Sequence, residues 1–553
     1  MEKNQIFEIR IEDMSEQGEG IGKVDGYTLF VKDALIGDRI EGKVIRAKKN
    51  YGYGKLLRIL EASPFRVDPL CPVAAPCGGC QLQAMSYERQ LRFKEDKVKN
   101  HLVRIGGFEE ETLPLQPIIG MEETEEGTRG YRYRNKGQFP FGRRKDGRIV
   151  YGFYAGRTHS IVEAGDCLLG SSINRRILET VRSFMEEYEI APYDEVRHEG
   201  LVRHVLIRNG FHTGEIMTCL VINGSELPHG KTLAERLMGI AGMASVTLNV
   251  NRRKTNVILG ERIIVLAGKA HITDRIGDLT YRISPQSFYQ VNPLQTEKLY
   301  GKALELAGLT GRETVWDLYC GTGTISLFLA RRAAQVYGVE IVPAAVENAR
   351  ENAALNGIAN AVFFEGRAEE VLPDWHGSHP EERADVIVVD PPRKGCDEAL
   401  LAVMVQMEPA RIVYVSCDSA TLARDLKYLC GAGYGLERVQ PVDMFPMTVG
   451  VETVVLLSKG EVDSKKIRVE FSLEDMDMSE FQDGATYTQI KEYVLEHSGL
   501  KVSNLYISQI KRKCGIEVGK NYNLPKSDDS RQPQCPPEKE EAIREAFKYF
   551  GMI

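Results

Sequence analysis

The chain has 553 residues, of which 43% are hydrophobic and 27% charged, and its formal net charge is −7 at pH 7. A chain of this length exceeds what one hydrophobic core supports, so about three or four domains are expected. No apolar run reaches the ~20 residues that cross a bilayer, and the N-terminus lacks the apolar segment of a signal peptide. The composition therefore predicts a cytoplasmic protein that does not associate with a membrane.

Residues 1–62 alternate short apolar segments with glycine-rich turns. This spacing predicts a small β-barrel, and barrels of the oligonucleotide-binding type have this size. Within it, residues 43–58 hold six Lys or Arg and no acidic residue. The acidic net charge alone argues against nucleic acid, but charge segregated in this way favours contact with phosphates.

Residues 63–280 predict a central β-rich domain. The segment 85–111 is predicted to form a helix that packs on the domain that follows. A second helix is expected near 173–187, and apolar runs predict strands at 204–210, 215–224, 245–251 and 255–260.

A group of three cysteines opens this central region. "CPVAAPCGGC" contains Cys71, Cys77 and Cys80, whereas zinc and iron–sulfur sites need four ligands. Two C-x2-C pairs would indicate zinc, so the uneven triplet favours a [4Fe–4S] cluster over zinc and over three unrelated thiols. Cys167, in a predicted turn, is the best candidate for the fourth ligand.

A basic segment follows at residues 128–148, with eight Arg or Lys against one Asp. Basic and aromatic residues together suit phosphate contact and base stacking, although a solvated strand face has the same composition. The predicted RNA-binding residues are Arg132, Arg134, Lys136, Arg143 and Arg144, with Tyr131, Tyr133, Phe139 and Phe141 interleaved among them.

From about residue 295 helices alternate with apolar strands, which predicts a parallel sheet with helices on both faces in a domain spanning 281–459. In "VWDLYCGTGTIS" the glycines Gly321 and Gly323 follow a strand, and Glu340 ends the next one. Glycines let a ligand approach the helix N-terminus, and a carboxylate there can bind both ribose hydroxyls. Without a P-loop lysine, this pattern indicates S-adenosylmethionine in a class I methyltransferase.

The acceptor atom is indicated by two later strands. In "DPPRKG", Arg393 stands where amino-methylating enzymes carry an aromatic residue, which disfavours nitrogen as the acceptor. The next strand ends at Cys417. A thiolate suits methylation of carbon 5 of a pyrimidine, because its addition to carbon 6 makes carbon 5 nucleophilic. Glu452, which begins an apolar strand, is the candidate base. The alternative for Cys417 is an ordinary buried thiol.

The C-terminal segment is polar after Lys459. Residues 460–484 are predicted to form a linker, and 485–553 a small module with two short helices and a capped C-terminal helix.

Taken together, the motifs resemble the RNA (uracil-5-)-methyltransferase family, in particular the RlmD-type 23S rRNA enzymes, over roughly residues 5–458. The resemblance is carried by "CGGCQLQ", "YRNK", "SPQSFYQVN", "DLYCGTG", "DPPRKG", "SCDSATLARDL" and "VETVVLL". It implies a TRAM-like RNA-binding barrel, a Rossmann-like catalytic domain and a monomeric enzyme. Many relatives carry His in the turn before the base, where this chain has Met447 and Gly450.

The resemblance also implies roles for individual residues. Cys417 would be the nucleophile and Glu452 the base that takes the carbon-5 proton. The [4Fe–4S] cluster would have a structural role, held by Cys71, Cys77, Cys80 and Cys167. S-adenosylmethionine would be bound by Gln290, Tyr319, Glu340 and Asp390, with Gly321 and Gly323 lining it.

The implied substrate is a uridine of 23S rRNA, flipped out of its stack to reach the thiol. Methylation of the T-loop uridine of tRNA is the first alternative. A non-catalytic RNA-binding or assembly factor is the second, and the presence of Cys417 and Glu452 argues against it. A DNA cytosine methyltransferase is disfavoured, because its cysteine follows proline on the strand that carries Asp390 here.

Overall fold

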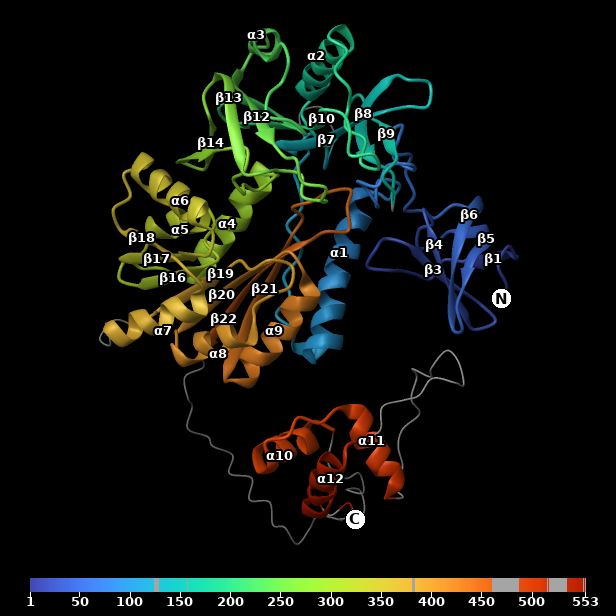
Figure 1. Cartoon of the computed structure of the whole chain (residues 1–553), viewed down its shortest axis with the longest axis vertical. Coiled ribbons are helices and arrows are strands. Elements are labelled where there is room, and N and C mark those ends of the chain that lie inside the picture. Colours follow the sequence, from blue (N-terminus) through green and yellow to red (C-terminus); the bar gives the residue numbers. More distant parts are fainter. Residues whose placement is uncertain are drawn as a thin grey trace. The chain divides into compact units, whose positions relative to one another are not determined.

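The structure is a computed structural model of the chain. It describes residues 1–123, 129–156, 158–379, 383–459, 487–514, 516, 535–550 and 552. The chain divides into two compact units, Met1–Glu461 and Val462–Ile553, each with its own apolar core (Figure 1).

The N-terminal part of the first unit is a curved six-stranded sheet with the order β1-β5-β6-β4-β3-β2. Buried and exposed residues alternate along its strands, as expected for a sheet with one apolar face. The ring of Phe7 lies over Gly42 and Gly54, where a β-carbon would come within 2.4 and 2.6 Å of it. The strands are β1 (Ile6–Arg10), β2 (Asp13–Met14), β3 (Gly20–Val24), β4 (Tyr27–Lys32), β5 (Arg39–Ala47) and β6 (Tyr51–Glu61).

Helix α1 (Tyr87–His101) follows the cysteine-rich segment and continues as a π-helical turn, Leu102–Gly106. It is shorter than the 85–111 predicted, because Gly107 adopts a left-handed φ of 74° and ends the turn. A short 3-10 turn, Glu110–Thr112, comes next. Val98 and Leu102 belong to the same apolar cluster as Leu422 and Leu426 of the catalytic domain.

The central sheet has seven strands in the order β13-β12-β11-β10-β7-β8-β9. Two helices, α2 (Ile173–Glu187) and α3 (Gly230–Met238), cover one of its faces through a shared apolar cluster. The strands are β7 (Lys136–Arg143), β8 (Ile149–Tyr154), β9 (Ile161–Glu163), β10 (Val202–Asn209), β11 (Ile216–Ile222), β12 (Met243–Val250) and β13 (Arg262–Gly268).

The predicted strand at 255–260 is wrong, and helix α3 was not predicted. The backbone at 255–260 is irregular because side chains, not a neighbouring strand, bind its carbonyl groups. Asn251 Nδ2 donates to Val257 O and Ile258 O at 2.7 and 2.9 Å, and Arg203 Nη2 donates to Thr255 O at 3.3 Å.

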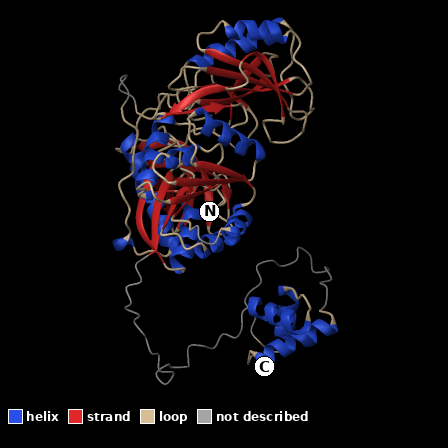
Figure 2. Ribbon diagram, turned by 90° about the vertical axis from the view of Figure 1, so that its left-hand side faces the viewer, coloured by secondary structure: helices blue, strands red, loops and turns tan. Residues whose placement is uncertain are grey.

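After the hairpin β14 (Ile272–Ile276) and β15 (Leu279–Ile283), the chain forms a second seven-stranded sheet, in the order β18-β17-β16-β19-β20-β22-β21. Helices flank its strands (Figure 2). Apolar clusters fill both faces of the sheet. The helices are α4 (Pro293–Ala307), α5 (Thr324–Ala330), α6 (Pro343–Leu355), α7 (Ala368–Ser378), α8 (Glu398–Gln406) and α9 (Ser419–Gly431).

The sequence predicted a parallel sheet, but this sheet is only partly parallel. The strands from β16 to β20 are parallel, but β22 runs antiparallel between β20 and β21. The connection 443–451 is too short for the crossover that a parallel neighbour needs. The strands are β16 (Thr314–Leu318), β17 (Gln335–Glu340), β18 (Ala361–Glu365), β19 (Val386–Val389), β20 (Arg411–Ser416), β21 (Tyr434–Val442) and β22 (Glu452–Lys459).

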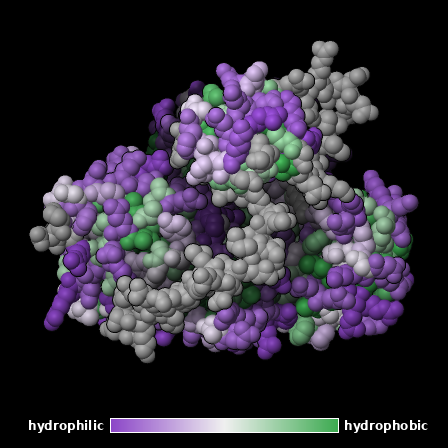
Figure 3. Space-filling model, turned by 90° about the horizontal axis from the view of Figure 1, so that it is seen from below, coloured by the Kyte–Doolittle hydropathy of each residue, from purple (hydrophilic) through white to green (hydrophobic). Residues whose placement is uncertain are grey.

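The second unit contains α10 (Tyr487–Ser498), α11 (Asn504–Lys513) and α12 (Pro537–Tyr549) around a core that includes Ile507 and Phe547. Across the part of the chain that the structure describes, every helix is too short or too polar to span a bilayer. Hydrophilic residues predominate on the face shown in Figure 3, with smaller apolar areas between them.

Candidate functional site

Strands β16, β17, β19 and β20 have their carboxyl ends at one edge of the catalytic sheet, where open α/β folds bind ligands. A cavity of about 1060 Å³ lies at this edge. Most of the residues predicted for the catalytic domain line it together, while Gly323 lies behind the lining at the N-cap of α5. The lining includes Gln290, Tyr319, Gly321, Glu340, Asp390, Cys417 and Glu452.

The turn after β16 fixes the position of Glu340. Tyr319, Gly321 and Gly323 have left-handed φ angles of 65°, 55° and 78°, which glycine adopts freely and tyrosine at a cost of about 1–2 kcal/mol. The Gly321 N–H donates to Glu340 Oε2 at 3.1 Å, and the Val342 N–H donates to Oε1 at 2.9 Å. The carboxylate of Glu340 is therefore held at the cavity wall by two backbone donors.

Asp317 lies buried beneath this turn and also lines the cavity. Its Oδ2 accepts a hydrogen bond from Ser326 Oγ at 2.5 Å, while its Oδ1 has no hydrogen-bond partner among the described residues. Burial raises the pKa of Asp317 to about 7. A buried carboxyl group with an unpartnered oxygen is stabilised by a cationic ligand.

Cys417 and Glu452 lie on neighbouring strands. Cys417 directly follows β20, and Glu452 is the first residue of β22. These strands pair antiparallel, with Ser416 opposite Thr453. One residue further along, the same register places Cys417 opposite Glu452. Both line the cavity, although Glu452 is only 3% exposed. A thiol and a carboxyl group therefore face one cavity from paired strands.

The carboxyl groups around Cys417 affect its ionisation. Burial and the charges of Glu452 and Asp390 raise the pKa of Cys417 to about 11, and the nearby Arg393 opposes this. Burial, with the charge of Asp390, also raises the pKa of Glu452. The Cys417 thiol is thus protonated at neutral pH, and a cation in the cavity would favour its thiolate.

The loop that carries Arg393 is fastened to helix α9. Thr421 Oγ1 donates to Arg393 O at 3.1 Å, and Arg424 Nη2 donates to Lys394 O at 3.0 Å. Asp425, fully buried, accepts from the Cys396 N–H at 2.8 Å. The sequence reasoning missed Asp425, although an aspartate on the apolar face of an amphipathic helix is a signal for such a contact.

A second loop, 284–291, brings Gln290 and Phe288 to the cavity. Buried Arg208 donates to the carbonyl oxygens of Pro285 and Ser287, and Asn135 Nδ2 donates to Gln290 O at 2.9 Å. Phe288 is 66% exposed although it is a large apolar residue. It was not predicted as a site residue, and its exposure beside the cavity distinguishes it from the core aromatics.

The N-terminal six-stranded sheet, which corresponds to the predicted barrel, also contributes to the cavity. Glu16, in the loop between β2 and β3, lines it together with Lys97 of α1. Glu16 Oε1 lies 2.6 Å from His101 Nε2, and His101 Nδ1 lies 2.8 Å from Ser419 Oγ at the start of α9. Neither Lys97 nor this link was predicted, since each depends on contacts between distant segments.

A separate pocket of about 290 Å³ is lined by Cys71, Cys77, Cys80 and Cys167. Burial, with the charges of the other three thiols, raises the pKa of Cys80 to about 12. Among the described residues, no three Cys, His, Asp or Glu side chains are placed to hold one metal ion. The four cysteines predicted as cluster ligands thus line one pocket.

The predicted RNA-binding residues do not form one exposed face. Arg132 binds Asp166 with two bonds of 2.7 Å, and Arg144 pairs with Glu163 at 3.0 Å. Arg143 donates to Gly147 O at 2.7 Å. The other two basic residues point to interior pockets: Lys136 lines the cysteine pocket, and Arg134 lines both that pocket and the larger cavity.

Base stacking by the interleaved aromatic residues is wrong for three of them. Tyr133, Phe139 and Phe141 are buried, with exposed fractions of 1, 2 and 3%. Phe139 and Phe141 belong to the core between the central sheet and its helices. Their alternation reflects the apolar face of β7, not a surface for RNA.

Comparison with known proteins identifies similar chains over most of this length. A family model described as tRNA (Uracil-5-)-methyltransferase matches residues 231–460, and a TRAM domain model matches residues 2–57. An "uncharacterized RNA methyltransferase" of Halalkalibacterium halodurans is 51% identical over 456 residues, which cover 82% of this chain and 97% of the relative. A protein of Clostridium tetani with the same description is 47% identical, over 83% of this chain and 98% of the relative.

Among solved structures, the tRNA (uracil-54, C5)-methyltransferase of Pyrococcus abyssi in complex with S-adenosyl-L-homocysteine is similar in sequence and fold. It is 30% identical with a TM-score of 0.65, and the match covers 82% of this chain and 100% of that one.

Proposed function

Because the chain belongs to the RNA (uracil-5-)-methyltransferase family, we propose that it methylates carbon 5 of a uridine in RNA through a covalent bond between Cys417 and carbon 6 of the base. The observation that carries this proposal is the pairing of β20 with β22, which brings Cys417 and Glu452 to the wall of one cavity. Neither residue alone would suffice, since attack and proton removal need separate groups.

The cavity residues suit S-adenosylmethionine, which supplies an electrophilic methyl group on a positively charged sulfur. Glu340, fixed by two backbone donors, would bind the ribose hydroxyls. Gln290, Tyr319, Asp390, Gly321 and Gly323 would complete the binding site. The unpartnered oxygen of buried Asp317 and the raised pKa of Asp390 support a cationic ligand, because a positive charge relieves the cost of ionising buried carboxyl groups.

The chain's own residues would act in two steps. The thiolate of Cys417 forms a bond to carbon 6, and the displaced electron pair makes carbon 5 nucleophilic. Once carbon 5 carries the methyl group, the Glu452 carboxylate takes the carbon-5 proton. The electron pair of that C–H bond restores the ring double bond as the C6–S bond breaks, which returns the thiolate to Cys417.

We expect adduct formation with 5-fluorouridine RNA to become faster with rising pH, by about tenfold per unit between about pH 6 and 8. The thiolate is the reactive form, and the pKa of Cys417 is raised to about 11, so its fraction falls as pH falls. The measurement is the single-turnover rate at saturating RNA and S-adenosylmethionine, so that binding does not contribute. A flat profile would contradict attack by a thiol whose pKa is raised.

RNA would approach across exposed aromatic and basic groups. Phe288 stands exposed at the cavity and could stack on a base. On the barrel, the rings of Phe30, Tyr51 and Tyr53 lie within 5.9 Å of one another near exposed lysines. Such a surface suits single-stranded RNA, with Arg134 at the cavity and Arg143 outside it.

We further propose that Cys71, Cys77, Cys80 and Cys167 hold a [4Fe–4S] cluster. Each thiolate of such a cluster binds a different iron, so the thiols stand further apart than around one zinc ion. The support for this proposal is that all four cysteines line one pocket. Arg134 and Lys136 also line the pocket, and neither forms an ion pair within the described residues, which favours an anionic occupant.

Anaerobically purified protein should therefore be brown and contain about four irons per chain. Replacing Cys167 with serine should remove most of the iron, because the cluster loses one of its four thiolates. Iron content and visible absorbance are the measurements, and Cys430→Ser, a cysteine on α9 outside the pocket, is the control. Colourless protein with stoichiometric zinc would contradict the cluster.

For the substrate, we propose 23S rRNA. The T-loop uridine of tRNA is the second candidate, favoured by the likeness to the Pyrococcus abyssi enzyme. The test is nucleoside-resolution mapping of 5-methyluridine in total RNA after deletion of the gene, followed by assays on separate rRNA and tRNA transcripts. Loss of the modification from tRNA alone would refute the rRNA assignment, and no loss in either RNA would refute the proposed function.

A further inference from the structure

The connection between β21 and β22, residues 443–451, ends directly at Glu452. Four of its residues, Phe445, Thr448, Val449 and Gly450, line the large cavity beside that carboxyl group. The connection has no regular secondary structure. Its conformation must therefore be set by contacts with other parts of the chain.

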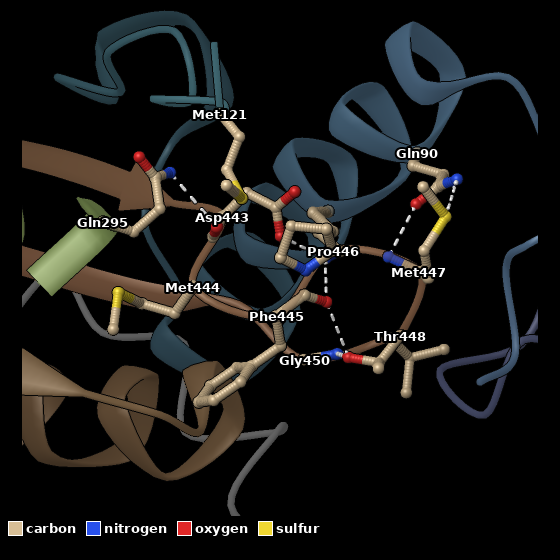
Figure 4. Close-up of polar contacts among 12 residues, drawn as sticks. Gln90, Met121, Gln295, Asp443, Met444, Phe445, Pro446, Met447, Thr448 and Gly450 are labelled. Carbon is tan, nitrogen blue, oxygen red and sulfur yellow. Dashed lines mark hydrogen bonds and ion pairs between the residues drawn. The ribbon is translucent and has the colours of Figure 1, made fainter. Parts of the chain in front are cut away.

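Those contacts are hydrogen bonds to main-chain carbonyl groups along the connection, and Figure 4 shows the one from Gln295 to Asp443. A loop whose carbonyls are bound along its length has few alternative conformations. The donors are Gln295 Nε2 to Asp443 O (3.1 Å), Asn292 Nδ2 to Met444 O (3.1 Å), Lys94 Nζ to Phe445 O (2.9 Å), Tyr133 Oη to Pro446 O (3.1 Å), the backbone N–H groups of Gln81 and Leu82 to Met447 O (3.1 and 3.0 Å), and Lys97 Nζ to Val449 O (3.3 Å).

A buried ion pair fixes the beginning of the connection. Lys94 Nζ contacts Asp443 Oδ1, and both side chains are fully buried. Tyr87 Oη donates to Asp443 Oδ2 at 2.8 Å. Removing one partner would leave a buried charge without compensation and would destabilise the whole protein. The pair thus fixes the geometry but does not suit a test by substitution.

Met447, in the middle, has a left-handed φ of 66°, which is uncommon for a residue with a side chain. Its N–H donates to Gln90 Oε1 at 3.0 Å, while Gln90 Nε2 donates to Met85 O at 2.8 Å and lies 3.3 Å from the Met447 sulfur (Figure 4). Strained backbone persists only where its surroundings over-determine it. Gln90 is one of the groups that do so here.

From these contacts we propose that Tyr133 and Gln90 are positioning residues for Glu452. They hold the connection so that the carboxylate faces carbon 5 after methyl transfer. This inference rests on the proposed covalent mechanism. The position of the base that removes the proton would then depend on residues outside the catalytic sheet, since Gln90 belongs to α1 and Tyr133 precedes β7.

The test compares two substitutions with one matched control. Tyr133→Phe removes only the hydroxyl that donates to Pro446 O, and Gln90→Met keeps the side-chain volume but loses the bond to Met447. The control is Tyr434→Phe. It removes the same kind of bond, from a buried tyrosine hydroxyl to Pro409 O at 3.1 Å, at the other end of β21.

Two rates are measured for each protein. The rate of adduct formation with 5-fluorouridine RNA reports attack and methyl transfer, because fluorine at carbon 5 cannot leave as a proton. Turnover on unmodified RNA also requires proton removal. In Tyr133→Phe and Gln90→Met we expect the first rate to stay within about twofold and the second to fall about tenfold, as for misplaced catalytic groups. Covalent adduct with unmodified RNA should accumulate.

Gln90→Glu should restore turnover, because a neutral carboxyl group can still accept from the Met447 N–H and donate to Met85 O. Tyr434→Phe should change neither rate. A parallel fall of both rates, or no change in either, would overturn the positioning role. Tyr133→Phe keeps the aromatic ring, so it tests this role even if Gln90→Met does not fold. If the unsubstituted protein formed no adduct with 5-fluorouridine RNA, the proposed function would fail, and this inference with it.

Discussion

Replacing Cys417 with alanine is expected to abolish methylation, by about 10⁴-fold or more, as for other covalent nucleophiles. Without the thiolate, carbon 5 of the pyrimidine is too weak a nucleophile to accept the methyl group. The substitution should also abolish the covalent complex with 5-fluorouridine RNA. Transfer of labelled methyl groups and a denaturing gel of the protein–RNA complex measure the two effects.

Cys430→Ala provides the control, since Cys430 lies on α9 outside the cavity. It should retain both activities. RNA affinity should be unchanged in Cys417→Ala, because the thiol contributes little to binding a large polyanion. A covalent complex that survives in Cys417→Ala would show that another residue is the nucleophile.

Glu452→Gln is expected to have a different effect. Attack by Cys417 and methyl transfer precede proton removal, so both should still occur. The adduct should then persist, because an amide cannot take the carbon-5 proton. Turnover should fall by about 10²–10⁴-fold, while a stable enzyme–RNA complex carrying the methyl group accumulates with ordinary uridine.

The neighbouring strand offers a matched control in Glu437→Gln, because Glu437 is an exposed residue of β21 that does not line the cavity. It should turn over normally. Combining Cys417→Ala with Glu452→Gln should eliminate the accumulated adduct, which establishes the order of the two steps. Normal turnover by Glu452→Gln would exclude this residue as the base.

Much of the site could be predicted from local sequence patterns. Residues at the carboxyl ends of apolar strands, such as Glu340, Asp390 and Cys417, lie together because parallel strands end at one sheet edge. Glu452 was found because it begins an apolar strand, but its pairing opposite Cys417 could not be predicted. That pairing depends on β22 entering the sheet antiparallel, between β20 and β21.

Features built from distant segments could not be read in this way. Tyr133 and Phe139 lie in a basic stretch whose composition indicated RNA stacking, yet both are buried. Phe139 belongs to the core beneath β7, and Tyr133 packs in a separate cluster with Tyr87 and Met447. Gln90 and Lys94 resemble ordinary residues of an amphipathic helix. Their role in holding 443–451 becomes visible only when α1 is placed against that connection.

The length of chain between these partners affects how the site is assembled during synthesis. Lys94 and Asp443 are separated by 349 residues, and Tyr87 and Asp443 by 356. Contacts of such separation form late, since the whole intervening chain must be made and ordered first. Helix α1 is therefore complete long before the ribosome adds the segment that it holds. The group for the last chemical step is also the last part of the site to emerge, so a nascent chain that ends after α9 carries the reactive thiol without the carboxylate that would release it.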